Sequence, residues 1–225
     1  MIVAVFPAVA AAIAFAFAAQ MGRQYARRRR AHALAWCLAL ALFGLASACV
    51  AVGVSAGWST PVFAVYWLAG ALLTVPLLAV GQLQLMDPKR ATLYWSLGAV
   101  AAAVALWFTL TADVEAGALR RASAQRGIPL GRQVLGGTTA YALARPFSLT
   151  FVVVVAGSVW SAAKTRRWGI LLIAAGVTVV AGSSSAVRVG QGQAFSVLLA
   201  VGVAMMYGGF LAASRPPRPA REPVP

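Results

Sequence analysis

The chain has 225 residues, of which 61% are hydrophobic and only 10% are charged. A soluble domain of this length carries about a quarter charged residues, so the composition excludes an ordinary water-soluble globule and favours a protein that folds in lipid. The formal net charge of +15 reflects 19 basic residues against only 4 acidic ones. Such a charge by itself suggests nucleic-acid binding, so the positions of the basic residues must decide between the two interpretations.

Seven apolar stretches are long enough to cross a bilayer, which takes about 20 residues of helix. They lie at residues 2–20, 33–54, 62–85, 91–112, 147–163, 168–186 and 194–213. Each is a continuous run rich in Ala, Leu or Val instead of an alternating pattern, which predicts helices and not strands. We therefore expect an all-α, polytopic membrane protein: a seven-helix transmembrane bundle over residues 1–213, followed by a disordered, proline-rich tail at residues 214–225.

The first apolar stretch is followed, and not preceded, by positive charge, since the segment RQYARRRRAHALAW begins at Arg23. A cleaved signal peptide has the opposite order, so we expect an uncleaved first helix. The run Arg27, Arg28, Arg29 and Arg30 is interpreted as a topology anchor, where arginine also meets anionic lipid of the inner leaflet. A loop this short offers no folded surface on which bases can stack, and nucleic acid is therefore not an expected partner.

The distribution of basic residues predicts the orientation of the chain. With the N-terminus outside, 13 of the 19 basic residues fall in cytoplasmic loops or in the tail. This bias follows the positive-inside rule, which predicts a cytoplasmic C-terminus in the cytoplasmic membrane of a bacterium. Trp36, near an expected inner helix end, is interpreted as an interfacial anchor, and Gln82 and Gln84 as interfacial amides.

The longest polar segment, residues 113–146, is expected outside. Its start predicts a short helix capped by Asp113, whose apolar face rests either on the bilayer surface or on the bundle. A candidate polar site at the outer mouth consists of Asp113, Glu115, Arg145, Ser184 and Arg188. The alternative, which we favour, is a contact between arginine and carboxylate that only holds the loop to the bundle.

Groups for catalysis or cofactor binding are scarce. The single histidine, His32, excludes bis-histidine haem ligation and disfavours a histidine metal site. No carboxylate is expected within a helix core, so a proton relay lacks its groups. Cys37 and Cys49 are roughly 18 Å apart along one expected helix, beyond disulfide distance. We therefore expect no catalytic, cofactor-binding or metal site and no enzyme activity.

Three segments resemble a group of small bacterial seven-helix membrane proteins: YWLAGALLTVPLLAVGQLQLMDPKR, GSVWSAAKTRRWGILLIAAG and VGVAMMYGGFLAAS. The resemblance implies the seven-helix fold and no particular activity. The architecture is also similar to that of microbial rhodopsins. Both lysines of this chain, Lys89 and Lys164, lie at expected inner helix ends, which excludes a retinal Schiff base in mid-membrane.

Three functional hypotheses follow. The leading one is a non-enzymatic accessory or ligand-responsive membrane component that acts through a protein partner or as a homo-oligomer. The alternative is a small transporter of a neutral or anionic solute, with a cavity lined by Thr74, Pro76 and Ser184 that reaches mid-membrane. A lipid-modifying enzyme is the least favoured, because no acid–base pair is visible.

Overall fold

The computed structural model describes the backbone of residues 2–166, 169–188 and 192–214, and the side chains of residues 4–166, 169–183 and 192–213. Every regular element in these ranges is helical. A shorter apolar helix covers Gly169–Ser183, and 6 helical segments are long and apolar enough to cross a membrane: Ala4–Arg28, Ala31–Ala56, Thr60–Met86, Pro88–Leu110, Thr139–Thr165 and Gly192–Ala213. The all-helical, multi-pass class predicted from the continuous apolar runs is confirmed for the described residues.

Helix α1 (Ile2–Arg28) continues well past Gln20, where the apolar run ends, and carries most of the basic cluster on its last turns. It stops at Arg29, which has a left-handed backbone with φ of 48° and donates its N–H to the carbonyl of Tyr25 at 2.7 Å. Helix α2 (Ala31–Ala56) begins almost at once. Gln, Met and Arg are good helix formers, so the backbone stays helical beyond the apolar boundary. The basic run is thus a helix end followed by a tight turn.

The third crossing consists of α3 (Thr60–Tyr66), a π-helical segment η1 (Trp67–Leu73) and α4 (Thr74–Met86). Pro76 accounts for the irregularity, because it has no N–H with which to continue the α-helical ladder. Just before it, Thr74 donates both its backbone N–H and its hydroxyl to the carbonyl of Ala69, the hydroxyl at 2.7 Å. The sequence predicts that the α-helical hydrogen bonding is interrupted at Pro76. In the structure the interruption takes the form of a wider, π-helical turn that precedes the proline.

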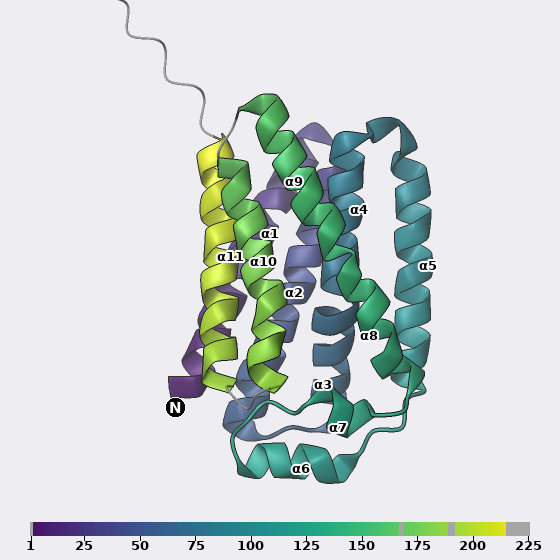
Figure 1. Cartoon of the computed structure of the whole chain (residues 1–225), viewed down its shortest axis with the longest axis vertical. Coiled ribbons are helices and arrows are strands. Elements are labelled where there is room, and N and C mark those ends of the chain that lie inside the picture. Colours follow the sequence, from purple (N-terminus) through teal and green to yellow (C-terminus); the bar gives the residue numbers. More distant parts are fainter. Residues whose placement is uncertain (1, 167–168, 189–191, 215–225) are drawn as a thin grey trace, which may run out of the picture.

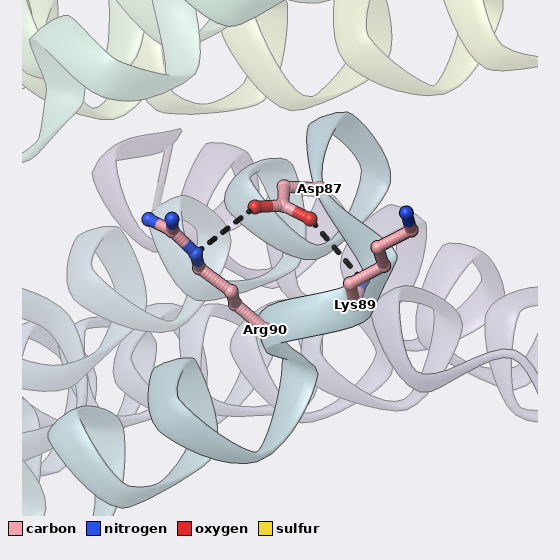
Figure 2. Close-up of polar contacts among 3 residues, drawn as sticks. All are labelled: Asp87, Lys89 and Arg90. Carbon is pink, nitrogen blue, oxygen red and sulfur yellow. Dashed lines mark hydrogen bonds and ion pairs between the residues drawn. The ribbon is translucent and has the colours of Figure 1, made fainter.

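A sharp turn joins α4 to α5 (Ala91–Leu110) through the short 3-10 segment η2 (Pro88–Arg90). Asp87 caps this turn: one carboxylate oxygen accepts the backbone N–H of Lys89 at 3.2 Å, and the other lies 3.5 Å from Nε of Arg90 (Figure 2). Both side chains of the ion pair are exposed, so it adds little stability and mainly holds the turn.

The segment at residues 113–146 contains α6 (Ala116–Ala124), α7 (Gly131–Leu135) and the start of α8 (Thr139–Leu149). The expected short helix is present as α6, but its cap is Glu115 and not Asp113. The Glu115 carboxylate accepts the N–H of Gly117 at 3.2 Å. Helix α8 starts ahead of the expected boundary at residue 147, and with α9 (Phe151–Thr165) it forms one crossing.

Helix α6 rests on the bundle, which resolves the two alternatives left by the sequence. Its residues Ala118, Leu119 and Ala122 are buried. Trp58, just after α2, donates its backbone N–H to Oγ of Ser123 at 2.7 Å and its indole Nε1 to the carbonyl of Gly127 at 2.8 Å. In Figure 1, α6 and α7 lie across one end of the bundle, called here the loop end.

Six helices pack as a closed ring in the order α1, α2, α4, α9, α10 (Gly169–Arg188) and α11 (Gly192–Ser214), with α11 returning against α1. Helix α5 stands outside this ring, against α4 and α8 (Figure 1). The opposite end of the bundle from the loop end is called the basic end, because α1 ends and α2 begins there with the arginine run. An apolar cluster that includes Phe17, Leu40 and Met206 fills the ring in the basic half.

Candidate functional site

The predicted outer-mouth site is only partly described. The side chains of Asp113, Glu115 and Arg145 are exposed, and the structure shows no ion pair among these three described residues. Glu115 instead caps α6. The side chains of Ser184 and Arg188 lie outside the described residues. Neither the outer-mouth site nor the arginine–carboxylate contact favoured over it is shown, and both stay predictions.

A cavity of about 1010 Å³ opens at the basic end, and all six helices of the ring contribute to its wall. We call it the basic-end cavity. Its volume is at the upper end of the range of about 300–1,000 Å³ that is typical of small-molecule sites. Such a space within a ring of helices is a candidate binding site, and its chemistry follows from the lining side chains.

Helix α1 provides the longest part of the wall, and its lining residues change from apolar to charged toward the mouth. Ala16 and Ala19 lie deepest, Gln20 follows, and Arg23 and Arg27 lie near the end of the helix. At 1.5 Å per residue, Ala16 and Arg27 are about 16 Å apart along the helix axis. The basic-end cavity is therefore a deep funnel with a positive mouth and a neutral interior.

Three buried polar atoms in the wall have no protein partner. Gln82 is 1% exposed and its Nε2 donor is unpaired, and the indole Nε1 of Trp36 is likewise buried and unpaired. The Oε1 acceptor of Gln20 is the third such atom, and all three residues line the cavity. A buried polar group left unpaired costs about 1–3 kcal/mol, and nearly all such groups in native proteins have a partner. Although their residues line the cavity, these atoms themselves are closed off by the surrounding helices and do not face the open space.

Two glycines allow neighbouring helices to pack closely against the unpaired donors. A Cβ atom on Gly81 of α4 would collide with the indole ring of Trp36, so the absence of a side chain lets the indole lie against the α4 backbone. A Cβ atom on Gly157 of α9 would lie 2.6 Å from both Cγ and Nε2 of Gln82. Both donors thus lie inside close contacts between helices and not on the open surface of the cavity.

The mouth of the basic-end cavity is positively charged. Arg23, Arg27, Arg28 and Arg30 line it together with His32, and no Asp or Glu is among the lining residues in the described part of the chain. The first turn of α2 also faces this region, and no side chain caps it. Uncapped N–H groups at a helix N-terminus favour bound anions, as guanidinium groups do. The mouth is therefore suited to a negatively charged group.

The deep part of the cavity is apolar, since Ala16 and Ala19 line it. Met21 and Ile173 belong both to the lining and to the buried cluster around Phe17. A separate void of about 30 Å³ lies among residues of α2, α4, α10 and α11, and Thr74 is part of its wall. This volume is about that of one water molecule. Of the groups predicted to line a mid-membrane cavity, Thr74 lines only this void, Pro76 lines neither space, and Ser184 has no described side chain.

Gln82 and Gln84, predicted as interfacial amides, are 1% and 2% exposed, so their side chains lie within the bundle; their depth in the membrane stays a prediction. Neighbouring helices α2, α5 and α9 cover the end of α4, which apolar length alone did not reveal. Trp36, predicted as an interfacial anchor, lines the cavity, and its Nε1 is buried against α4. A usable signal was present on α1, where Gln20, Gln24 and Arg27 recur at helical spacing and share one face.

Within the described part of the chain, no three His, Cys, Asp or Glu side chains are placed to hold a metal ion. The thiols of Cys37 and Cys49 are free. What the basic-end cavity presents is positive charge beside polar and apolar side chains, a lining suited to binding a molecule.

Comparison of the chain with protein-family models, with curated protein sequences and with solved structures finds no match. Its function is therefore inferred from the chemistry of the basic-end cavity.

Proposed function

We propose that this chain is a non-enzymatic, ligand-responsive protein of the bacterial cytoplasmic membrane that binds an anionic molecule in the basic-end cavity and acts through a partner protein. The observation that carries the proposal is the mouth of the cavity, which is lined by Arg23, Arg27, Arg28 and Arg30, with no Asp or Glu among the described lining residues. Guanidinium groups without a carboxylate partner favour a bound anion.

The positive mouth supports an anionic ligand in particular. Four arginines line it without a carboxylate among the described lining residues to neutralise them. Arg27 and Arg28 also occupy the last turn of α1, where positive charge suits the helix dipole. That local benefit does not require a cavity. The combination of arginines, an uncapped α2 N-terminus and a cavity behind them supports binding beyond a topology anchor.

In this proposal the basic end faces the cytoplasm, with seven membrane helices, the N-terminus outside and the C-terminus inside. The excess of basic residues at this end supports the orientation. At the basic end the protein contacts anionic lipids of the inner leaflet. It also contacts a partner protein or a second copy of the chain there.

The orientation is tested by labelling single cysteines in a variant without Cys37 and Cys49. Arg120→Cys on α6 and Lys164→Cys on α9 both replace exposed side chains. A membrane-impermeant maleimide added to intact cells is expected to label position 120 and to reach position 164 only after the membrane is opened. Labelling of position 164 in intact cells would reverse the orientation.

A transporter remains the alternative, and the opening of the cavity at one end supports it. An apolar floor and a void of only about 30 Å³ beyond it separate the cavity from the loop end. A charged solute would need the ring to rearrange before it could pass this layer. The geometry therefore favours binding over transport.

The ligand is sought by extracting the protein from native membrane in polymer nanodiscs and identifying every molecule that is retained by mass spectrometry. The wild type is expected to retain one negatively charged small molecule or lipid at stoichiometric amount, and Arg27→Gln to lose it. A stoichiometric protein that copurifies supports action through a partner. Retention of the same molecules by wild type and variant would count against ligand binding in the basic-end cavity. Movement of a solute into liposomes that contain the protein alone would favour transport.

A further inference from the structure

We infer that His32 binds a proton together with the anion in the basic-end cavity, so that occupancy of this site responds to pH. This inference rests on the proposed function and specifies how the site is regulated. The observation behind it is the position of the imidazole, which is half-buried, lines the arginine mouth and belongs to the first turn of α2. His32 is also the only histidine in the sequence.

The imidazole of His32 is within reach of a bound molecule. It makes no hydrogen bond in the described part of the chain. The side-chain atoms that the described helices close off without a partner belong to three glutamines and to Trp36, and the ring nitrogens of His32 are not among them. Because His32 lines the cavity, its ring nitrogens are open to the space that the anion occupies.

The groups that surround this imidazole are positive or neutral on every element that lines the cavity. The arginines come from α1 and from the turn before α2: Arg23, Arg27, Arg28 and Arg30. Tyr207 on α11 is the other titratable group, and a tyrosine is neutral at physiological pH. The described lining residues of α4, α9 and α10 carry no ionisable side chain. No carboxylate in the described lining can therefore neutralise an imidazolium.

A bound anion supplies the missing negative charge. Without it, a positive charge on the imidazole is opposed by the like charge of Arg30 and by the N-terminal end of the α2 dipole. An anion at the mouth attracts the imidazolium, which donates an N–H from either ring nitrogen, whereas a neutral imidazole has a single N–H to donate. The anion and the proton therefore stabilise each other's binding, and this coupling is reciprocal.

The direction of the pH dependence follows from the charge of the imidazolium. Histidine changes its charge between about pH 5 and 8, so the affinity for an anion of fixed charge rises as the pH falls through this range. The cavity then fills when the compartment at the basic end becomes acidic. In the proposed orientation this compartment is the cytoplasm, and the protein reports both its pH and its anion to the partner.

The experiment uses the full chain in nanodiscs of phosphatidylcholine, with sulfate as the probe. Sulfate remains a dianion over this pH range, so a change in its affinity belongs to the protein. Calorimetric titration measures the affinity at about pH 5.5 and pH 8, at one low ionic strength. Titrations in two buffers with different heats of ionisation count the protons taken up. The wild type is expected to bind sulfate about tenfold more tightly at the lower pH and to take up protons as it binds.

Two substitutions at His32 separate its charge from its titration. His32→Gln stays neutral, and is expected to bind sulfate at both pH values as weakly as the wild type does at pH 8. His32→Arg stays positive, and is expected to bind tightly at both pH values. Arg27→Gln is the matched control, because Arg27 lines the same mouth and does not titrate in this range. It is expected to weaken binding about tenfold at both pH values and to keep their ratio.

The outcomes distinguish this inference from the proposed function. Equal wild-type affinities at the two pH values, or a pH dependence that persists in His32→Gln or in His32→Arg, would overturn the proton coupling and leave the anion site standing. Sulfate that binds the wild type at neither pH would overturn the anion site together with the coupling. Circular dichroism of each variant confirms that the helices are intact, and either His32 variant alone decides the result if the other does not fold.

Discussion

Replacing Gly176 with alanine is the most direct test of how the wall of the basic-end cavity is built. Helices α10 and α11 meet backbone to backbone at this glycine. A Cβ atom there would lie 2.5 Å from the carbonyl oxygen of Gly202 and 2.9 Å from the backbone nitrogen of Met206. Backbone atoms cannot rotate away as the end of a flexible side chain can, so the two helices must separate.

The expected change in the free energy of unfolding on Gly176→Ala follows from two opposing effects. Overpacking a close contact costs about 1–3 kcal/mol, and a backbone contact belongs at the upper end. Alanine regains about 1 kcal/mol of helix propensity over glycine. We therefore expect Gly176→Ala to lower the free energy of unfolding by about 2 kcal/mol. Gly182 is the matched control on the same helix, because a Cβ atom there meets nothing within 4 Å.

The assay is reversible unfolding in mixed micelles with increasing sodium dodecyl sulfate, followed by circular dichroism. Gly182→Ala is expected to be neutral or to stabilise by up to about 1 kcal/mol, the opposite sign to Gly176→Ala. Equal stability of the two variants would refute the backbone packing of α10 on α11, and with it the position of Ile173 in the cavity wall.

Three further substitutions are informative. Gln84→Leu removes a buried unpaired amide and is expected to raise the free energy of unfolding by about 1–2 kcal/mol in the same assay; a decrease would show that the amide has a partner. Gly81→Ala is expected to displace the Trp36 indole and to lower the free energy of unfolding by about 1–2 kcal/mol in the same assay; unchanged stability would refute the close contact between Trp36 and α4. Ser123→Ala deprives the backbone N–H of Trp58 of its acceptor and is expected to speed limited proteolysis of α6 several-fold, whereas unchanged cleavage would show that this bond does not hold the loop.

The sequence was most informative about the class of the protein. Long apolar runs with few charges determine membrane helices, because lipid offers no partners for an open backbone. The helix expected near Asp113 is present as α6, since capping residues and apolar spacing act locally. Helix ends were less predictable. Helix α1 continues through the arginines because helix propensity does not stop where hydrophobicity does.

The candidate site could not be derived from the sequence, although its residues are all visible there. Gln82 looked interfacial because its position along α4 is near a helix end, and only the packing of α9 and its Gly157 over that end buries it. The basic-end cavity requires α4 beside α9 and α11 beside α1, pairs that are far apart in the chain. Apolar surfaces of similar Ala and Val content do not specify which helices meet, because lipid competes equally for all of them. Composition and charge order thus determined a membrane helix bundle with one strongly basic end, whereas glycine contacts between particular helices decided which polar side chains face one another inside it.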